Sequence, residues 1–208
     1  MDLIDNNTND DSSKSMFSFN YYRQYFNVTT EDILVKIRST LSFRESRAFF
    51  SNSQQEIFGS IWVPITSSFI TLICGQLFWI VRGKSRPFHL STGIYITCLL
   101  FAFTFAYPLL YRAISKASSP PAYIALCSLF GYGVIYLVPL SILRLIIWKK
   151  ISFILISLFG GISSYSLFVK LDSFHNDFDS KKKMFMNNII LMGANFLLVV
   201  IVEYIAFK

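Results

Sequence analysis

Three ionisable side chains lie inside long apolar runs of this 208-residue chain: Arg144, Lys170 and Glu203. A charge in an apolar medium is costly, so it usually pairs with an opposite charge or serves the movement of protons or ions. Each of these three lies about one turn from the end of its run, where a long side chain can extend to a polar interface. We therefore expect all three to reach the interface, whereas a proton-coupled transporter would place a carboxylate nearer the centre of a run.

Cysteine and histidine do not indicate a metal site or a disulfide. Cys74, Cys98 and Cys127 each lie within an apolar run, without CxxC spacing and without acidic or histidine neighbours, so we interpret them as small buried apolar residues. His89 and His175 lie in different polar loops and lack the spacing of a ligand pair. We predict no metal and no cofactor.

Motifs of known enzyme classes do not stand out either. Intramembrane hydrolases carry paired acids or a Ser/His set inside apolar segments, and the chain has neither arrangement. It also lacks a Walker-type loop and a GxGxxG sequence. We therefore predict a non-enzymatic protein, with no catalytic, cofactor-binding or metal-ligating residues.

The composition indicates that lipid is part of this protein's solvent. The chain is 53% hydrophobic and only 15% charged, which is more apolar surface than a soluble domain of this length can bury. Its net charge of +7 is unevenly placed: residues 1–58 hold six Lys/Arg against eight Asp/Glu, and residues 59–208 hold thirteen against four. The cations thus gather around the apolar runs, as they do beside membrane helices, and a nucleic-acid partner is not supported.

Five apolar segments of about 20 residues, the length that crosses a hydrocarbon core of about 30 Å, follow one another with short connections. We predict an all-α, polytopic membrane protein: a bundle of five transmembrane helices with a short amphipathic cytosolic helix and a disordered N-terminus. The predicted domains are a disordered tail at 1–20, a cytosolic aromatic and amphipathic segment at 21–58, and a five-span membrane domain at 59–207. The predicted spans are 59–81, 90–111, 122–146, 151–170 and 187–207.

The amphipathic helix is expected shortly before the first span. Thr29 or Thr30 suits the N-cap position and is followed at once by two acidic residues. Apolar side chains then form one stripe, and an aromatic patch precedes it: Ile33, Leu34, Ile37 and Leu41 in the stripe, and Tyr21, Tyr22, Tyr25 and Phe26 in the patch. The helix either folds against the protein's own membrane domain or binds a lipid surface or a partner. The candidate partner-facing residues are the patch together with Ile33, Ile37 and Leu41.

The distribution of cations favours a cytosolic N-terminus and a lumenal C-terminus. No basic region followed by an apolar core opens the chain, so a cleaved signal peptide is not expected. With five spans and a cytosolic N-terminus, ten of the seventeen Lys/Arg from residue 36 onward face the cytosol and seven face the other side. Two glycosylation sequons, at Asn6 and Asn27, would then carry no glycan.

The stretch "GYGVIYLVPLSIL" at 131–143 interrupts the third predicted span. Pro139 cannot donate a hydrogen bond to the carbonyl four residues earlier, so the helix should be distorted there. Gly131 and Gly133 allow another helix to approach, and the hydroxyls of Tyr132 and Tyr136 need partners in lipid. A transporter with broken helices would repeat such an interruption in two halves, which five spans do not offer, so we interpret the stretch as a packing hinge.

Three segments resemble the Yip family, the Yip-domain proteins that interact with Ypt/Rab GTPases. "EIFGSIW" resembles the D-L-Y-G-P motif that opens the family's first span, with Ser60 in place of the expected proline. "GYGVIYLVP" resembles the G-Y-G-type stretch with its downstream proline, and "YYRQYFNVTTEDIL" resembles the aromatic "YYxxYFDV" segment. The motif residues are Glu56, Ile57, Phe58, Gly59, Gly131, Tyr132, Gly133 and Pro139.

The resemblance implies a multi-pass membrane protein of the Golgi or endoplasmic reticulum with a cytosolic N-terminal region. It further implies a non-enzymatic adaptor in vesicle-mediated transport that associates with prenylated Rab/Ypt GTPases and with other Yip-family proteins. Two alternatives remain open from the residues themselves. One is a small transporter or channel, and the other is a membrane-shaping protein whose helix at 30–42 inserts into one leaflet.

Overall fold

The structure is a computed structural model that describes residue 26 and residues 28–42, 56–83, 89–115, 123–147, 149–172 and 178–207. Every regular element in these residues is helical, and five stretches of helix are long and apolar enough to cross a membrane: 58–81, 90–113, 123–146, 151–171 and 188–207. The predicted all-α bundle of five spans is therefore confirmed, and each predicted boundary agrees to within two residues. The tail predicted at 1–20 lies outside the described residues.

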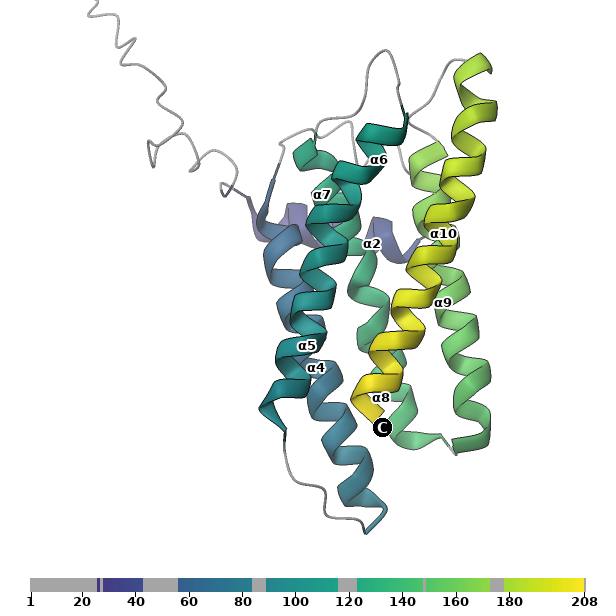
Figure 1. Ribbon diagram of the computed structural model, residues 1–208. Coiled ribbons are helices and arrows are strands. Elements are labelled where there is room, and N and C mark those ends of the chain that lie inside the picture. Colours follow the sequence, from purple (N-terminus) through teal and green to yellow (C-terminus); the bar gives the residue numbers. More distant parts are fainter. Residues whose placement is uncertain are drawn as a thin grey trace, which may run out of the picture.

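The spans run lengthwise beside one another (Figure 1). The first span is α4 (Phe58–Val81). The second consists of α5 (Leu90–Phe101), the π-helical turn η1 (Ala102–Ala106) and α6 (Tyr107–Ser115). The third consists of α7 (Tyr123–Gly133), the 3-10 turn η2 (Val134–Tyr136) and α8 (Leu137–Ile146). The fourth and fifth are α9 (Lys149–Asp172) and α10 (Phe178–Phe207).

The third span is the most enclosed helix of the bundle. In its most apolar stretch 72% of the residues are buried, against 50% or less in each of the other spans. Its apolar side chains point in every direction, which is typical of a helix surrounded by others. The fully buried ones include Leu126, Leu129, Phe130, Leu137 and Leu140. Residues on this span are therefore placed to contact several other helices at once.

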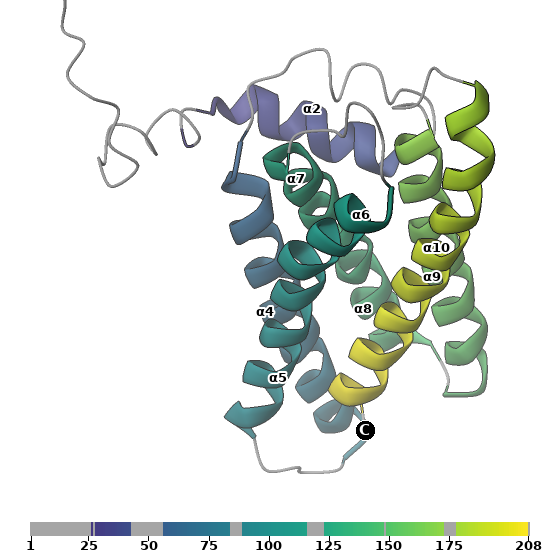
Figure 2. The same cartoon turned by 45° about the horizontal axis from the view of Figure 1, so that its top comes forward.

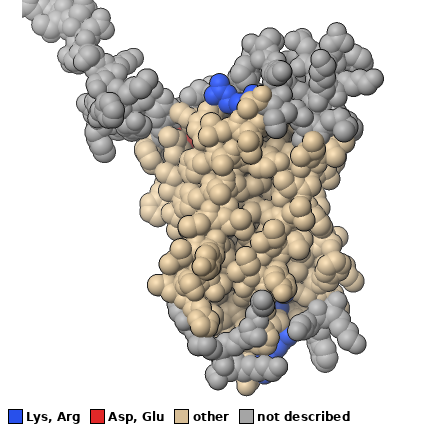
Figure 3. Space-filling model, in the orientation of Figure 1, with Lys and Arg blue, Asp and Glu red and all other residues tan. Residues whose placement is uncertain are grey.

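The outer surface of the bundle has the character of a membrane-facing protein. Figure 3 shows a broad band without charged side chains, with Lys and Arg above and below it. Aromatic residues that suit the membrane interface are half exposed or more near both ends of the spans: Trp62 and Tyr165 at one end, Tyr95 and Tyr204 at the other. A band of this kind matches the five apolar spans, so the chain is a multi-pass membrane protein.

Two prolines stand next to the irregular turns of the spans. The 3-10 turn η2 comes directly before α8, which contains Pro139, so the distortion expected from "GYGVIYLVPLSIL" is present. The π-helical turn η1 comes just before Pro108, which has no N–H to donate to the carbonyl of Thr104.

Two of the three cysteines occupy the expected buried positions. Cys74 and Cys127 are 4% and 2% exposed. Cys98 is exposed on the outside of the second span, so the expectation of burial is wrong for this residue. A thiol on the outside of an apolar span still faces an apolar medium, because lipid surrounds the bundle there.

The remaining described helix, α2 (Thr30–Leu41), is the predicted amphipathic helix. Figure 2 shows it lying crosswise to the spans, near the end of the bundle where α4 begins. It packs against the third span, and two of its apolar side chains adjoin the main core. Its position brings the segment before the first span into direct contact with the membrane domain.

Candidate functional site

The N-terminal end of α2 is closed by its own residues. The Asp32 N–H donates to Thr29 Oγ1 and the Thr29 N–H donates to Asp32 Oδ2, each at 3.2 Å. The Thr29 hydroxyl donates to the same Oδ2 at 2.7 Å. These hydrogen bonds hold the pKa of Asp32 below its usual range. The N-cap predicted at Thr29 or Thr30 is thus confirmed at Thr29, with a reciprocal capping box.

The C-terminal end of α2 is capped instead by side chains from two membrane spans. The Thr40 carbonyl accepts hydrogen bonds from the Tyr136 hydroxyl at 2.7 Å and from the Ser166 hydroxyl at 2.9 Å. Ser166 Oγ in turn accepts from Lys170 Nζ at 3.1 Å. The last carbonyls of a helix have no partner within it and carry partial negative charge, so hydroxyls and an ammonium group suit them. Lys170 is only 3% exposed, and the expectation that it extends to the interface is wrong.

A buried ion pair joins α2 to the entrance of the first span. Lys36 Nζ lies 2.6 Å from Glu56 Oε1, and their side chains are 10% and 1% exposed. Glu56 stands two residues before α4 begins, and its side chain is fully enclosed by the protein. Removing one partner of a buried ion pair leaves a buried charge without compensation, which is strongly destabilising. The pair therefore fixes α2 relative to α4.

The two span motifs meet beside this ion pair. The Tyr132 ring packs so closely over Gly59 that a Cβ on that glycine would overlap the ring. A Cβ on Gly131 would lie 2.6 Å from the Cα of Ser60, which is itself fully buried. Residues without side chains let two helix backbones approach closely, so α4 and α7 are in direct contact at this point. The motifs "EIFG" and "GYG" thus form one structural site, together with α2.

The other motif residues lie around this contact rather than in it. Ile57 and Phe58 are half-buried, and the Phe58 ring lies tilted at 37° to the Trp62 ring, with ring centroids 6.2 Å apart. Gly133 faces α9, where a Cβ would lie 3.1 Å from the Leu167 side chain. Pro139 is half-buried in α8, beyond η2.

The predicted partner-facing residues are divided by the docking of α2. Ile33 and Ile37 pack against the core of the bundle, so this part of the stripe faces the protein's own membrane domain. Leu41 and Phe26 are 44% and 46% exposed. The remaining members of the aromatic patch, Tyr21, Tyr22 and Tyr25, lie outside the described residues. The partner-facing role of all seven residues stays a prediction.

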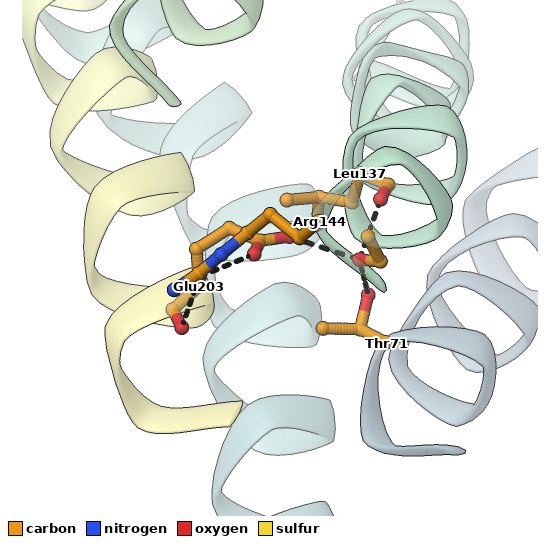
Figure 4. A network of polar contacts seen from close by, with 5 residues as sticks. Thr71, Leu137, Arg144 and Glu203 are labelled. Carbon is orange, nitrogen blue, oxygen red and sulfur yellow. Dashed lines mark hydrogen bonds and ion pairs between the residues drawn. The ribbon is translucent and has the colours of Figure 1, made fainter. Parts of the chain in front are cut away.

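A second polar cluster lies inside the bundle, toward its other end (Figure 4). Arg144 of α8 forms an ion pair with Glu203 of α10, with Nη1 2.8 Å from Oε2, and also donates to the Glu203 backbone carbonyl at 3.0 Å. The other carboxylate oxygen lies 2.9 Å from Ser141 Oγ, which lies 2.9 Å from Thr71 Oγ1 of α4. Glu203 is fully buried, so the expectation that Arg144 and Glu203 extend to the interface is wrong.

The positions of Arg144 and Glu203 in the sequence contain a signal for this ion pair. Arg144 and Glu203 lie close to the ends of the third and fifth predicted spans, and in a bundle of alternating helices these ends lie on the same side. Opposite charges at matching depth in neighbouring spans satisfy each other within the bilayer. No comparable signal points to Tyr136 and Thr40, because the acceptor there is a backbone carbonyl.

The chain is similar to a curated protein over most of its length. No protein-family model matches the chain, and no solved structure matches it. Among curated proteins, the chain is similar to "Protein YIPF1 homolog" of Dictyostelium discoideum, with 26% identity over 174 residues. The match covers 80% of this chain and 50% of that protein, so the chain spans about half the length of the curated relative.

Proposed function

We propose that this chain, whose resemblance to the Yip family is confirmed by its curated relative, is a non-enzymatic membrane adaptor in vesicle-mediated transport. It would reside in the Golgi or endoplasmic reticulum membrane, act in transport between these two compartments or within the Golgi, and present its N-terminal segment to the cytosol. Its partners would be prenylated Rab/Ypt-type GTPases and other Yip-family proteins. The bilayer association itself follows from the five apolar spans.

One observation supports the adaptor proposal best: α2 is held rigidly on the bundle while its outward side is exposed. The Lys36–Glu56 ion pair and the two hydrogen bonds to the Thr40 carbonyl fix the helix at two points. Glu31, Val35 and Arg38, spaced by three and four residues, lie on its outward side and are exposed. A rigid helix loses little conformational entropy when a partner binds, which favours association.

A prenylated partner suits such a platform for a physical reason. A single lipid chain gives only marginal and reversible membrane binding, so stable retention requires a second contact. A helix face at the membrane surface supplies that contact at the right distance from the bilayer. The adaptor would thus add protein affinity to lipid affinity.

The test uses the full chain in lipid nanodiscs and a panel of prenylated Rab/Ypt GTPases. We expect at least one GTPase to be retained, and retention to be lost when Val35→Glu and Arg38→Glu are combined on the outward face of α2. Thr30→Glu is the control, because it also adds negative charge to α2, but at the helix N-terminus, where such charge is tolerated. Retention of no GTPase, or equal retention by all variants, would contradict the proposal.

A transporter is the second candidate, because the Arg144–Glu203 cluster places charged groups inside the bundle. Ionisable residues within spans mark many ion and proton pathways. If the chain is a transporter, we expect solute flux in proteoliposomes. Substitution of Tyr132, Tyr136 or Pro139 should abolish this flux, and substitutions on the outward face of α2 should not affect it. The adaptor proposal expects the same three changes to weaken helix packing and to leave no flux difference.

A further inference from the structure

The bundle covers only one side of α2 and leaves an apolar flank exposed. The inward residues, which face the bundle, are Ile33, Lys36, Ile37 and Thr40. At about 3.6 residues per turn, Leu34 and Leu41 lie two turns apart on one flank, whereas Asp32 and Ser39 lie on the roughly opposite flank. Leu34 and Leu41 are 59% and 44% exposed. The helix is therefore amphipathic across its two flanks as well as between its inward and outward sides.

The anchors of α2 fix its depth relative to the spans. Ser166, which bonds the Thr40 carbonyl, lies five residues before the end of the fourth span at Leu171. At 1.5 Å per residue this is about 7 Å along the helix axis. Tyr136, which bonds the same carbonyl, belongs to the third span. The C-terminal half of α2 thus lies within the length of the spans and not beyond their ends.

Exposed aromatic residues on two spans lie at about the same depth as the residues that anchor α2. Trp62 lies one turn into α4, close after Glu56, and Tyr165 is the direct neighbour of Ser166 on α9. Both side chains are 51% exposed on the outside of the bundle. Trp and Tyr are enriched where the lipid headgroups meet the acyl chains. The apolar flank of α2 therefore lies at the same depth in the membrane as part of the lipid-facing surface of the bundle.

We propose that the flank formed by Leu34 and Leu41 contacts the acyl chains of one leaflet, so that α2 is an in-plane interfacial helix anchored to the bundle. Amphipathic helices of this kind lie about 5–10 Å into the boundary between headgroups and acyl chains, a range that includes the depth of the Ser166 anchor. The polar flank with Asp32 and Ser39 faces the headgroups and water. Lipid is the occupant because the flank lies at the level of Trp62 and Tyr165, the exposed aromatic residues that mark the interface. The proposal needs no GTPase and stands apart from the proposed function.

The test measures which solvent reaches each side of α2. A small fluorescent amino acid replaces Leu34, Leu41, Val35 or Arg38, one position at a time, in the full chain reconstituted in phosphatidylcholine nanodiscs. Doxyl-labelled lipids should quench the probe at 34 and 41, whereas aqueous iodide should quench it at 35 and 38. Iodide quenching at 34 and 41 as strong as at 35 and 38 would overturn the proposal. Protection of 34 and 41 from both quenchers would overturn it too, because a protein surface would then cover the flank.

A pair of matched charge variants tests the same contact, because a charge on the flank should move it out of the acyl chains. With the probe at 41, Leu34→Glu should reduce quenching by doxyl lipids, since a carboxylate on the flank must leave the acyl chains. Val35→Glu adds the same charge on the outward side and should leave the quenching unchanged. Equal effects of the two variants would show that the flank and the outward side meet the same medium, and would overturn the proposal.

Discussion

At the scale of single residues, the buried pair of Arg144 and Glu203 provides the sharpest prediction. Glu203→Leu leaves the guanidinium group inside an apolar bundle without its ion-pair partner. We expect a loss of about 3–5 kcal/mol in the free energy of unfolding, the usual cost of breaking a buried pair. The free energy is measured from the unfolding transition of the purified protein in micelles of a mild detergent, to which a denaturing detergent is added in increasing proportion.

The double variant Arg144→Leu, Glu203→Leu is the matched control for that loss. Replacing a whole buried ion pair with apolar residues is often neutral, so the double variant should unfold close to the parent protein. The coupling between the two changes then measures the interaction. A double variant that is destabilised by the sum of the two single changes would show that the residues act separately.

This pair also shows what single residues in a sequence can and cannot reveal. The apolar runs around Arg144 and Glu203 predicted that both lie in spans, and that prediction is confirmed. Their burial depends on which spans are neighbours, and the length and composition of a span do not contain that information. The burial of Lys170 is also invisible in the sequence. Its hydrogen-bond partner Ser166 binds the Thr40 carbonyl, and that contact depends on where α2 docks.

At the scale of elements, α2 depends on the bundle for one of its two ends. Tyr136→Phe removes one of the two hydroxyls that donate to the Thr40 carbonyl. We expect a loss of about 1 kcal/mol, and therefore about fivefold faster hydrogen exchange in the last turn of α2. The measurement is hydrogen–deuterium exchange of the reconstituted protein, followed by mass spectrometry.

Tyr95→Phe is the control for this prediction. It removes the same hydroxyl from a tyrosine that is 68% exposed on the outside of the second span, away from α2. Exchange in α2 should match the parent protein in this variant. Identical exchange in the Tyr136→Phe variant would show that the tertiary cap does not hold the helix end.

The elements differ in how far local sequence determines them. The spans follow from apolar length, the N-cap at Thr29 from side-chain chemistry, and the turn η2 from Pro139, so all three were predictable. The inward side of α2 was predicted only in part. Its apolar members Ile33 and Ile37 belonged to the predicted stripe, whereas Lys36 and Thr40 dock through partners distant in sequence. Such contacts arise from the arrangement of the spans and leave no local pattern.

At the scale of the whole molecule, the docked α2 makes the two ends of the bundle unequal. One end carries a crosswise helix fixed by Glu56, Tyr136 and Ser166 from three different spans or their borders. Among the described residues no second helix lies across the other end, where the short connections of the spans follow. An interfacial helix on one side only would occupy area in one leaflet and not in the other. The side on which α2 lies therefore matters for every function considered.

Orientation is the final prediction, and it follows from the distribution of charge. With α2 on the cytosolic side, ten of the seventeen Lys/Arg from residue 36 onward lie in cytosolic segments and seven on the lumenal side, the bias that membrane insertion favours. We expect a glycan on an acceptor sequence carried by a flexible Gly/Ser insert between the first and second spans. The same insert between the second and third spans is the control and should stay unmodified, as should the native sequons at Asn6 and Asn27. The readout is a shift in electrophoretic mobility that a glycosidase reverses.

A glycan on either native sequon would place α2 in the lumen, beyond the reach of cytosolic GTPases, and would contradict the orientation and the adaptor proposal together.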